Sequence, residues 1–149
     1  KDISALSVKE LSRIGLSIMR QGGQVFTTMT VSENLDVAFG NNPDTAYRNM
    51  ITSMVPLLNG QDKELMKRTA DKLSGGQRHQ LALAMALATK PSLLILDEPL
   101  HGLDNHHCRL VKDIIEAFCQ RKDKTLIMVT HYPEELPSCI TNTLHIRKN

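Results

Sequence analysis

The sequence predicts an α/β fold with a mainly parallel sheet and an additional α-helical subdomain. Two short apolar runs, residues 93–96 and 125–130, have the length of buried strands, and the amphipathic stretch 105–120 lies between them. A strand, a helix and a second strand of these lengths are typical of a βαβ unit, whose two strands are parallel. Residues 27–90, in contrast, show helical spacing and no strand pattern.

The first 26 residues are expected to supply one further core strand. Ile14, Leu16 and Ile18 alternate with more polar neighbours, as in a half-buried strand. The sequence Gln-Gly-Gly-Gln at positions 21–24 predicts a flexible break after that strand.

Segment 27–90 is expected to contain several helices. A helix is predicted to begin at residues 30–34, and a second one covers 45–58 and ends at Asn59-Gly60. A short charged helix is expected at 63–72. The nearly all-apolar stretch 77–89 predicts a buried helix that Lys90-Pro91 ends. Its apolar run is too short to cross a bilayer.

The C-terminal part is expected to complete the sheet. Residues 93–96 are apolar on both faces of a strand, which predicts a central position in a parallel sheet with helices on both sides. Strand 125–130 is expected to be buried as well, a further helix is predicted to begin at Pro133, and residues 144–146 are a candidate final strand.

Composition limits the classes of function. The 149 residues suit one domain, and the aromatic fraction of 3% implies a core of aliphatic side chains. A net charge of +2 and the lack of a basic stripe argue against nucleic-acid binding. Three cysteines without metal-site spacing favour free thiols in a reducing compartment. Because the chain begins with Lys1, we expect a truncated start.

Two carboxylates, Asp97 and Glu98, directly follow strand 93–96. Ligands of parallel sheets bind outside the carboxyl ends of the strands. Pro99 is expected to hold Glu98 in an extended backbone and to send the two side chains in different directions. One carboxylate can then hold Mg²⁺ and the other can take a proton from an attacking water. The alternative is an acidic pair that only marks a strand end, but the cost of desolvating both groups favours a functional role.

The sequence Leu-Ser-Gly-Gly-Gln at positions 73–77 has two interpretations. Ser74 and Gln77 fit a helix capping box. Gly75 and Gly76 instead leave room for a phosphate beside the N–H groups of a helix start. The five residues alone do not decide between the two. Because Ser74 precedes Asp97 by 23 residues, which is enough for one helix and one strand, the phosphate interpretation is favoured.

Two other polar residues are candidates for the same site. His131 follows strand 125–130 as Asp97 follows strand 93–96, so parallel strands would bring both to one edge. A histidine there can donate to a phosphate oxygen or position a water, although a helix-capping or merely exposed role is the alternative. Gln21, before the helical segment, could reach the metal or the water.

A zinc site is not expected, although four residues of suitable type lie close in sequence. Adjacent histidines cannot share one helix face, and the sequence offers no second cluster of ligands. The four residues are His101, His106, His107 and Cys108. A phosphate-binding loop of the form Gly-x-x-x-x-Gly-Lys-Ser/Thr is also missing from these 149 residues.

These motifs resemble those of ATP-binding cassette (ABC) ATPases, in order and spacing, across essentially the whole chain. Residues 73–77 resemble the signature motif, and 93–99 resemble the Walker B segment. Residues 102–104 (Gly-Leu-Asp) resemble the D-loop, His131 the switch histidine and Gln21 the Q-loop glutamine, for which Gln24 competes. The resemblance implies an incomplete P-loop NTPase core whose phosphate-binding loop lies upstream of Lys1.

The resemblance also implies roles for single residues and the cofactors ATP and Mg²⁺. A metal role falls to Asp97 and Gln21, and catalytic roles fall to Glu98 as general base and His131 as γ-phosphate contact. Asp104 would couple two ATP sites. The residues implied to bind the ATP held by a partner subunit are Ser74, Gly75, Gly76 and Gln77.

The expected assembly is a head-to-tail dimer with a second ABC nucleotide-binding domain, together with transmembrane permease subunits. Residues 1–26 and 91–149 would form the core, 27–90 the helical subdomain, and the protein would lie on the cytoplasmic face of a membrane. The expected function is ATP hydrolysis coupled to solute transport, with the isolated chain inactive. The alternatives are a soluble ABC ATPase acting on nucleic acid or ribosomes and a non-hydrolysing module.

Overall fold

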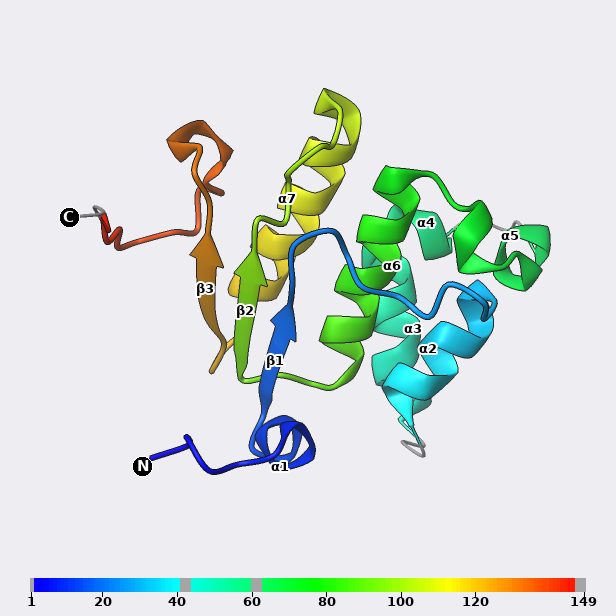
Figure 1. The fold of residues 1–149 in the computed structure, drawn as a ribbon, viewed down its shortest axis with the longest axis horizontal. Helices are drawn as coiled ribbons and strands as arrows, with labels where there is room; N and C mark the ends of the chain where they lie inside the picture. The colour runs from blue at the N-terminus through cyan, green and yellow to red at the C-terminus, as the bar shows by residue number, and fades with distance from the viewer. Residues whose placement is uncertain (1, 41–43, 60–62, 147–149) are drawn as a thin grey trace.

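A three-stranded parallel sheet forms the centre of the molecule (Figure 1). The computed structural model describes residues 2–40, 44–59 and 63–146. The strands are β1 (Leu16–Met19), β2 (Leu93–Asp97) and β3 (Thr125–Val129), in the order β1-β2-β3. Ile18 pairs with Ile95, which pairs with Ile127. The predicted parallel sheet with a central 93–96 strand is therefore confirmed.

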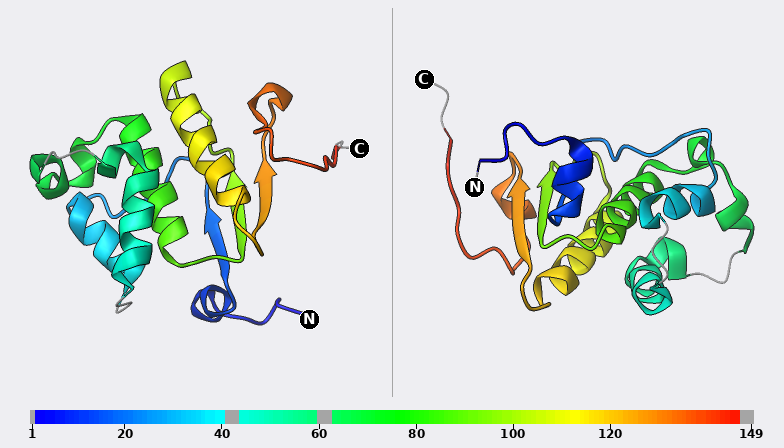
Figure 2. Two further views of the ribbon diagram at one scale, coloured as in Figure 1. Left: turned by 180° about the vertical axis from the view of Figure 1, so that it is seen from behind. Right: turned by 90° about the horizontal axis from the view of Figure 1, so that it is seen from below.

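The hydrophobic core lies on one face of this sheet. Leu94 and Leu96 are fully buried there, in one cluster with residues of α6 (Gly75–Ala88) and α7 (Asn105–Cys119). Figure 2 shows α7 on this side of the sheet. On the opposite face, Ile18 and Ile127 remain 49% and 47% exposed. The expectation of helices on both faces, and of a buried β3, is therefore wrong for the described residues.

In the described part of segment 27–90 the elements are helical, as predicted, and an isolated antiparallel bridge joins Thr30 and Thr69. The predicted helix 45–58 is interrupted at Val55, since a residue before proline is disfavoured in the helical region. The charged helix predicted at 63–72 is also divided. Besides α6, the elements are α2 (Val31–Phe39), α3 (Thr45–Met54), α4 (Pro56–Asn59), α5 (Lys63–Lys67) and the 3₁₀ turn η1 (Ala70–Lys72).

Helix α6 joins this helical part to the sheet. Leu81 and Leu83 are fully buried, as predicted for this apolar stretch. The buried side chain of Gln80 accepts a hydrogen bond from the Leu57 N–H at 2.9 Å, and the Tyr47 hydroxyl donates to the Leu87 carbonyl at 2.6 Å. These bonds tie α3 and α4 to α6. The middle and the C-terminal end of α6 are therefore anchored to the neighbouring helices.

The two ends of the chain differ from expectation. Helix α1 (Val8–Arg13) was not predicted, although Ser7 and Glu10 form a capping box at its start, and Ile14 caps its C-terminus instead of opening β1. Instead of the helix predicted from Pro133, the described residues after β3 form only the short 3₁₀ turn η2 (Pro133–Glu135). Residues 144–146 form no strand, and Leu144 is 84% exposed because it finds no partner strand among the described residues. None of the described helices has the length and hydropathy that a membrane crossing needs.

Candidate functional site

The backbone of Glu98 turns sharply at the carboxyl end of β2. The Glu98 N–H donates to the Val129 carbonyl at 2.9 Å, which joins the ends of β2 and β3. Glu98 has a φ of +49°, so the expected extended backbone is wrong. The His101 N–H closes the turn by donating to the Glu98 carbonyl at 3.2 Å. A positive φ is uncommon outside glycine and is retained where the surrounding structure enforces it.

This turn buries the Glu98 side chain beside His131. Glu98 is 4% exposed, and its Oε1 accepts a hydrogen bond from the His131 N–H at 3.1 Å. The His131 Nε2 lies 3.5 Å from the same oxygen, and its ring is 86% exposed. The other oxygen, Oε2, has no partner among the described residues. A buried carboxylate oxygen without a donor is able to accept a proton from a substrate or a water.

Asp97 ends β2 on the other face of the strand from Leu94 and Leu96, as the strand alternation requires. Its carboxylate forms no hydrogen bond within the described part of the chain, which leaves both oxygens available. Such oxygens are the ligands that Mg²⁺ prefers, so Asp97 fits a metal role.

Gln21 follows the neighbouring strand at the same edge of the sheet. Met19, the last residue of β1, pairs with Leu96, so Gln21 lies just beyond the strand end. The break predicted here is a defined turn in which the Gly23 N–H donates to the Arg20 carbonyl at 3.2 Å. Gln24, the competing residue, is exposed and faces a groove in front of α6.

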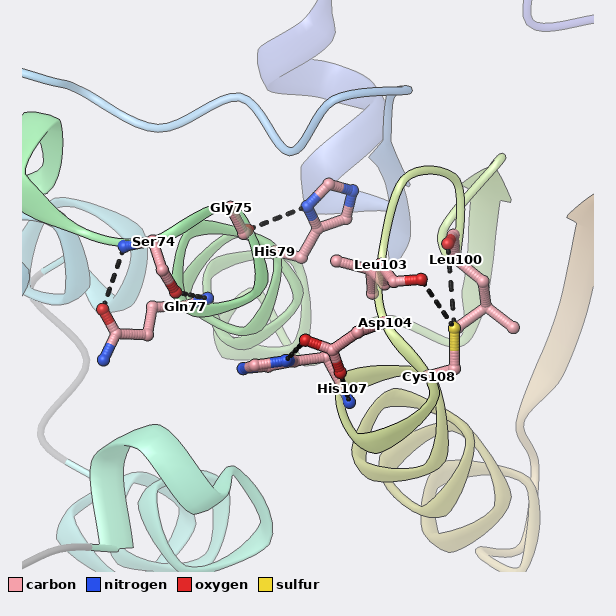
Figure 3. A network of polar contacts seen from close by, with 9 residues as sticks. All are labelled: Ser74, Gly75, Gln77, His79, Leu100, Leu103, Asp104, His107 and Cys108. Carbon is pink, nitrogen blue, oxygen red and sulfur yellow. Dashed lines mark hydrogen bonds and ion pairs between the residues drawn. The ribbon is translucent and has the colours of Figure 1, made fainter.

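The start of α6 forms the capping box that the first interpretation of residues 73–77 predicts, while phosphate binding stays a prediction (Figure 3). Ser74 Oγ accepts from the Gln77 N–H at 3.2 Å, and Gln77 Oε1 accepts from the Ser74 N–H at 3.0 Å, which completes the capping box. Ser74 and Gly75 are nevertheless exposed, and open space surrounds the position that a Gly75 Cβ would occupy. The helix tip is therefore capped internally and accessible from outside.

Asp104 caps the start of α7 and fixes the ring of His107. The Asp104 carboxylate accepts the His107 N–H at 2.9 Å and lies 2.8 Å from the ring Nδ1 (Figure 3). These hydrogen bonds lower the pKa of the exposed Asp104 carboxyl. The ring then packs against Gly76, where a Cβ would lie only 2.3 Å from it. His107 thus connects the tips of α6 and α7, and its spacing three residues after Asp104 was the available sequence signal.

A second histidine, His79, is buried beneath the same helix tip. Its Nδ1 bonds to the Gly75 carbonyl at 3.1 Å, while Nε2 has no partner among the described residues. Burial lowers the pKa of this imidazole, which favours the neutral ring with Nδ1–H as donor. The Gly75 carbonyl, at the exposed tip of α6, therefore accepts its hydrogen bond from the neutral imidazole of His79.

The structure groups the predicted site residues in two places. Gln21, Asp97, Glu98 and His131 lie at the carboxyl edge of the sheet. Residues 74–77 and Asp104 lie at the neighbouring tips of α6 and α7. Within the described ranges, no three His, Cys, Asp or Glu side chains gather as a metal site.

Relatives of known type match most of the chain. The Fe(3+) ions import ATP-binding protein FbpC of Mesorhizobium japonicum is 32% identical over 119 residues, which cover 80% of this chain and 32% of the relative. The ergothioneine transport ATP-binding protein EgtV of Helicobacter pylori is 30% identical over 145 residues, which cover 95% and 67%. The chain thus spans about a third to two thirds of the length of these curated relatives.

A solved structure shows the same fold. The ATP-binding cassette MJ0796, in a dimeric post-hydrolysis state bound to ADP and Pi, superposes with a TM-score of 0.70 at 22% identity. The match covers 88% of this chain and 60% of that one, so the α/β fold is that of an ABC ATPase core. The ABC transporter family model matches residues 1–101. The chain therefore belongs to the ABC transporter family, as an ABC nucleotide-binding domain.

Proposed function

We propose that the native polypeptide carrying this chain is the ATP-hydrolysing subunit of an ABC transporter and couples hydrolysis to solute transport. Its membership of the family and the names of its import and transport relatives support this proposal. Those names favour import. In the proposed division, residues 1–26 and 91–149 form the nucleotide-binding core, and 27–90 form the helical subdomain.

The buried Glu98 carboxylate carries the catalytic part of the proposal. Its Oε2 has no donor among the described residues, and its Oε1 faces the backbone and ring of His131. Glu98 takes the proton of the water that attacks the γ-phosphate, and His131 contacts that phosphate. Asp97 and Gln21 would hold Mg²⁺. When bound, Mg²⁺ neutralises charge on the phosphate oxygens.

A second nucleotide-binding domain is the proposed partner, arranged head to tail. The exposed helix tip with Ser74, the open Gly75 position and Gln77 would contact the ATP held by that partner. Unsatisfied N–H groups and the helix dipole favour an anion at such a tip. Asp104 would couple the two sites. The helical subdomain would dock on permease subunits at the cytoplasmic face of the membrane.

The decisive experiment replaces Glu98 with Gln in the native polypeptide. Glu98→Gln keeps the side chain size but removes the base, so steady-state ATP hydrolysis should fall by about 10²–10⁴-fold while ATP binding persists. Glu134→Gln, on the exposed turn η2, is the matched control and should retain activity. Turnover by Glu98→Gln at the wild-type rate would remove Glu98 from the mechanism.

The isolated 149 residues are proposed to be inactive by themselves, because they hold no Gly-x-x-x-x-Gly-Lys-Ser/Thr loop for the α- and β-phosphates. A phosphate-release assay with ATP and Mg²⁺ should give the background rate. Magnesium-dependent hydrolysis that Glu98→Gln abolishes would contradict this. A non-hydrolysing module is the second candidate, and it predicts that the native polypeptide is also inactive.

A further inference from the structure

Two cysteines that are 20 positions apart in the sequence meet in the fold. The Cys139 Sγ donates a hydrogen bond to the Cys119 Sγ at 2.9 Å, although both thiols are free. That separation exceeds the bonded sulfur distance by only about 0.9 Å. Both residues are half-buried, at the end of α7 and in the segment after η2. The sequence predicts free thiols, as these two are, and tertiary packing brings them into contact.

The contact belongs to a longer attachment along one stripe of α7. Lys112 Nζ donates to the Glu134 carbonyl at 3.0 Å. Glu116 Oε1 accepts both the N–H of Ser138 at 3.0 Å and its hydroxyl at 2.7 Å. Positions 112, 116 and 119 lie on the same helix face. The segment 134–139, here called the strap, is thus held on α7 at three successive positions, and the cysteine pair is the last.

We propose that Cys119 and Cys139 are a reversible dithiol–disulfide pair that locks the strap onto α7. The closed loop would contain β3 and His131, so oxidation would restrict the turn that carries this histidine. Cys108 is excluded from the pair because its thiol faces the carbonyls of Leu100 and Leu103.

The oxidant required is a low-molecular-weight disulfide such as oxidised glutathione. One of the two cysteines, as thiolate, attacks the glutathione disulfide, displaces one glutathione thiolate and forms a mixed disulfide. The other cysteine, as thiolate, then attacks the protein sulfur of that mixed disulfide and releases the second glutathione. The two cysteines lose two protons and two electrons, and one glutathione disulfide becomes two thiols.

Peptide mapping of the native polypeptide tests the proposal. The folded protein is incubated with oxidised glutathione, remaining thiols are blocked with N-ethylmaleimide, and the digest is analysed by mass spectrometry. We expect a Cys119–Cys139 linked peptide, Cys108 mainly alkylated, and reversal by dithiothreitol. The equilibrium constant for unfolding should be about 10²-fold smaller in the oxidised form than in the reduced form. Amide exchange in the strap should also be slower. Separate glutathione adducts, or alkylation of both Cys119 and Cys139, would overturn the pair.

A variant of the strap contact shows whether the fold brings the thiols together. Glu116→Ala removes the acceptor for Ser138 and should slow ring closure several-fold, so that the glutathione mixed disulfide of one of the two cysteines accumulates. Glu134→Ala is the matched control, since its bond to Lys112 uses the backbone carbonyl. Conversion of the mixed disulfide into the disulfide should also be at least about tenfold slower in guanidinium, because in the unfolded chain the two cysteines meet only by diffusion. Equal closure rates in both variants and in denaturant would refute an organised pair.

Discussion

Replacing Gly76 with Ala should destabilise the protein, whereas the same change at Gly75 should not. A Cβ at position 76 would lie 2.3 Å from Cδ2 and 2.5 Å from Cγ of His107. The ring cannot turn away freely, since its Nδ1 is held 2.8 Å from the Asp104 carboxylate. Apart from its own helix and flanking residues, no described residue lies within 4 Å of a Cβ at Gly75. The same Gly→Ala substitution can therefore be compared at a crowded position and at an open position of one helix.

The magnitude follows from two opposing effects. Alanine in place of glycine in a helix stabilises by roughly 0.5–1 kcal/mol. An added methyl group in a filled space costs about 1–3 kcal/mol. Gly76→Ala should therefore lower the free energy of unfolding by about 1–2 kcal/mol, and Gly75→Ala should leave it unchanged or raise it slightly. In a His107→Ala background the clash is gone, so Gly76→Ala should become neutral or stabilising.

Equilibrium urea denaturation of the four variants measures this double-mutant cycle. We expect a coupling free energy between positions 76 and 107 of about 1–3 kcal/mol. The reasoning fails if Gly76→Ala is equally destabilising with and without the His107 ring, because the cost would then come from the helix backbone.

Two further predictions concern buried polar groups. Because burial lowers the pKa of His79, the unfolded chain takes up a proton first as the pH falls below about 6.5, so folding stability should decrease from pH 7 to pH 5. His79→Asn, which retains a donor for the Gly75 carbonyl, should show a smaller loss in urea titrations; an equal loss would assign the pH dependence to other groups. Tyr47→Phe removes the 2.6 Å bond to the Leu87 carbonyl and should lower the unfolding free energy by about 1 kcal/mol, while the exposed Tyr132→Phe should not. Equal thermal midpoints for wild type and Tyr47→Phe would show that water replaces this bond.

The sequence by itself determined the features that depend on nearby residues. Periodicity identified β2, β3 and α7, and the two motifs placed Asp97 and Ser74 at a strand end and a helix start. The proline at position 56 is also a local signal, from which the helix break at Val55 could have been predicted. These signals are local, because helix periods and caps span only three or four positions.

Tertiary structure alone decided how distant segments meet. The positive φ of Glu98 and its bond to His131 depend on a partner 33 positions away. The ring of His107 over Gly76 and the Cys119–Cys139 contact likewise join separate elements. Ile127 is apolar and lies in a strand, yet it is half-exposed, because the sequence of a strand does not specify what covers it. Such contacts arise from packing between elements, which sequence periodicity does not encode.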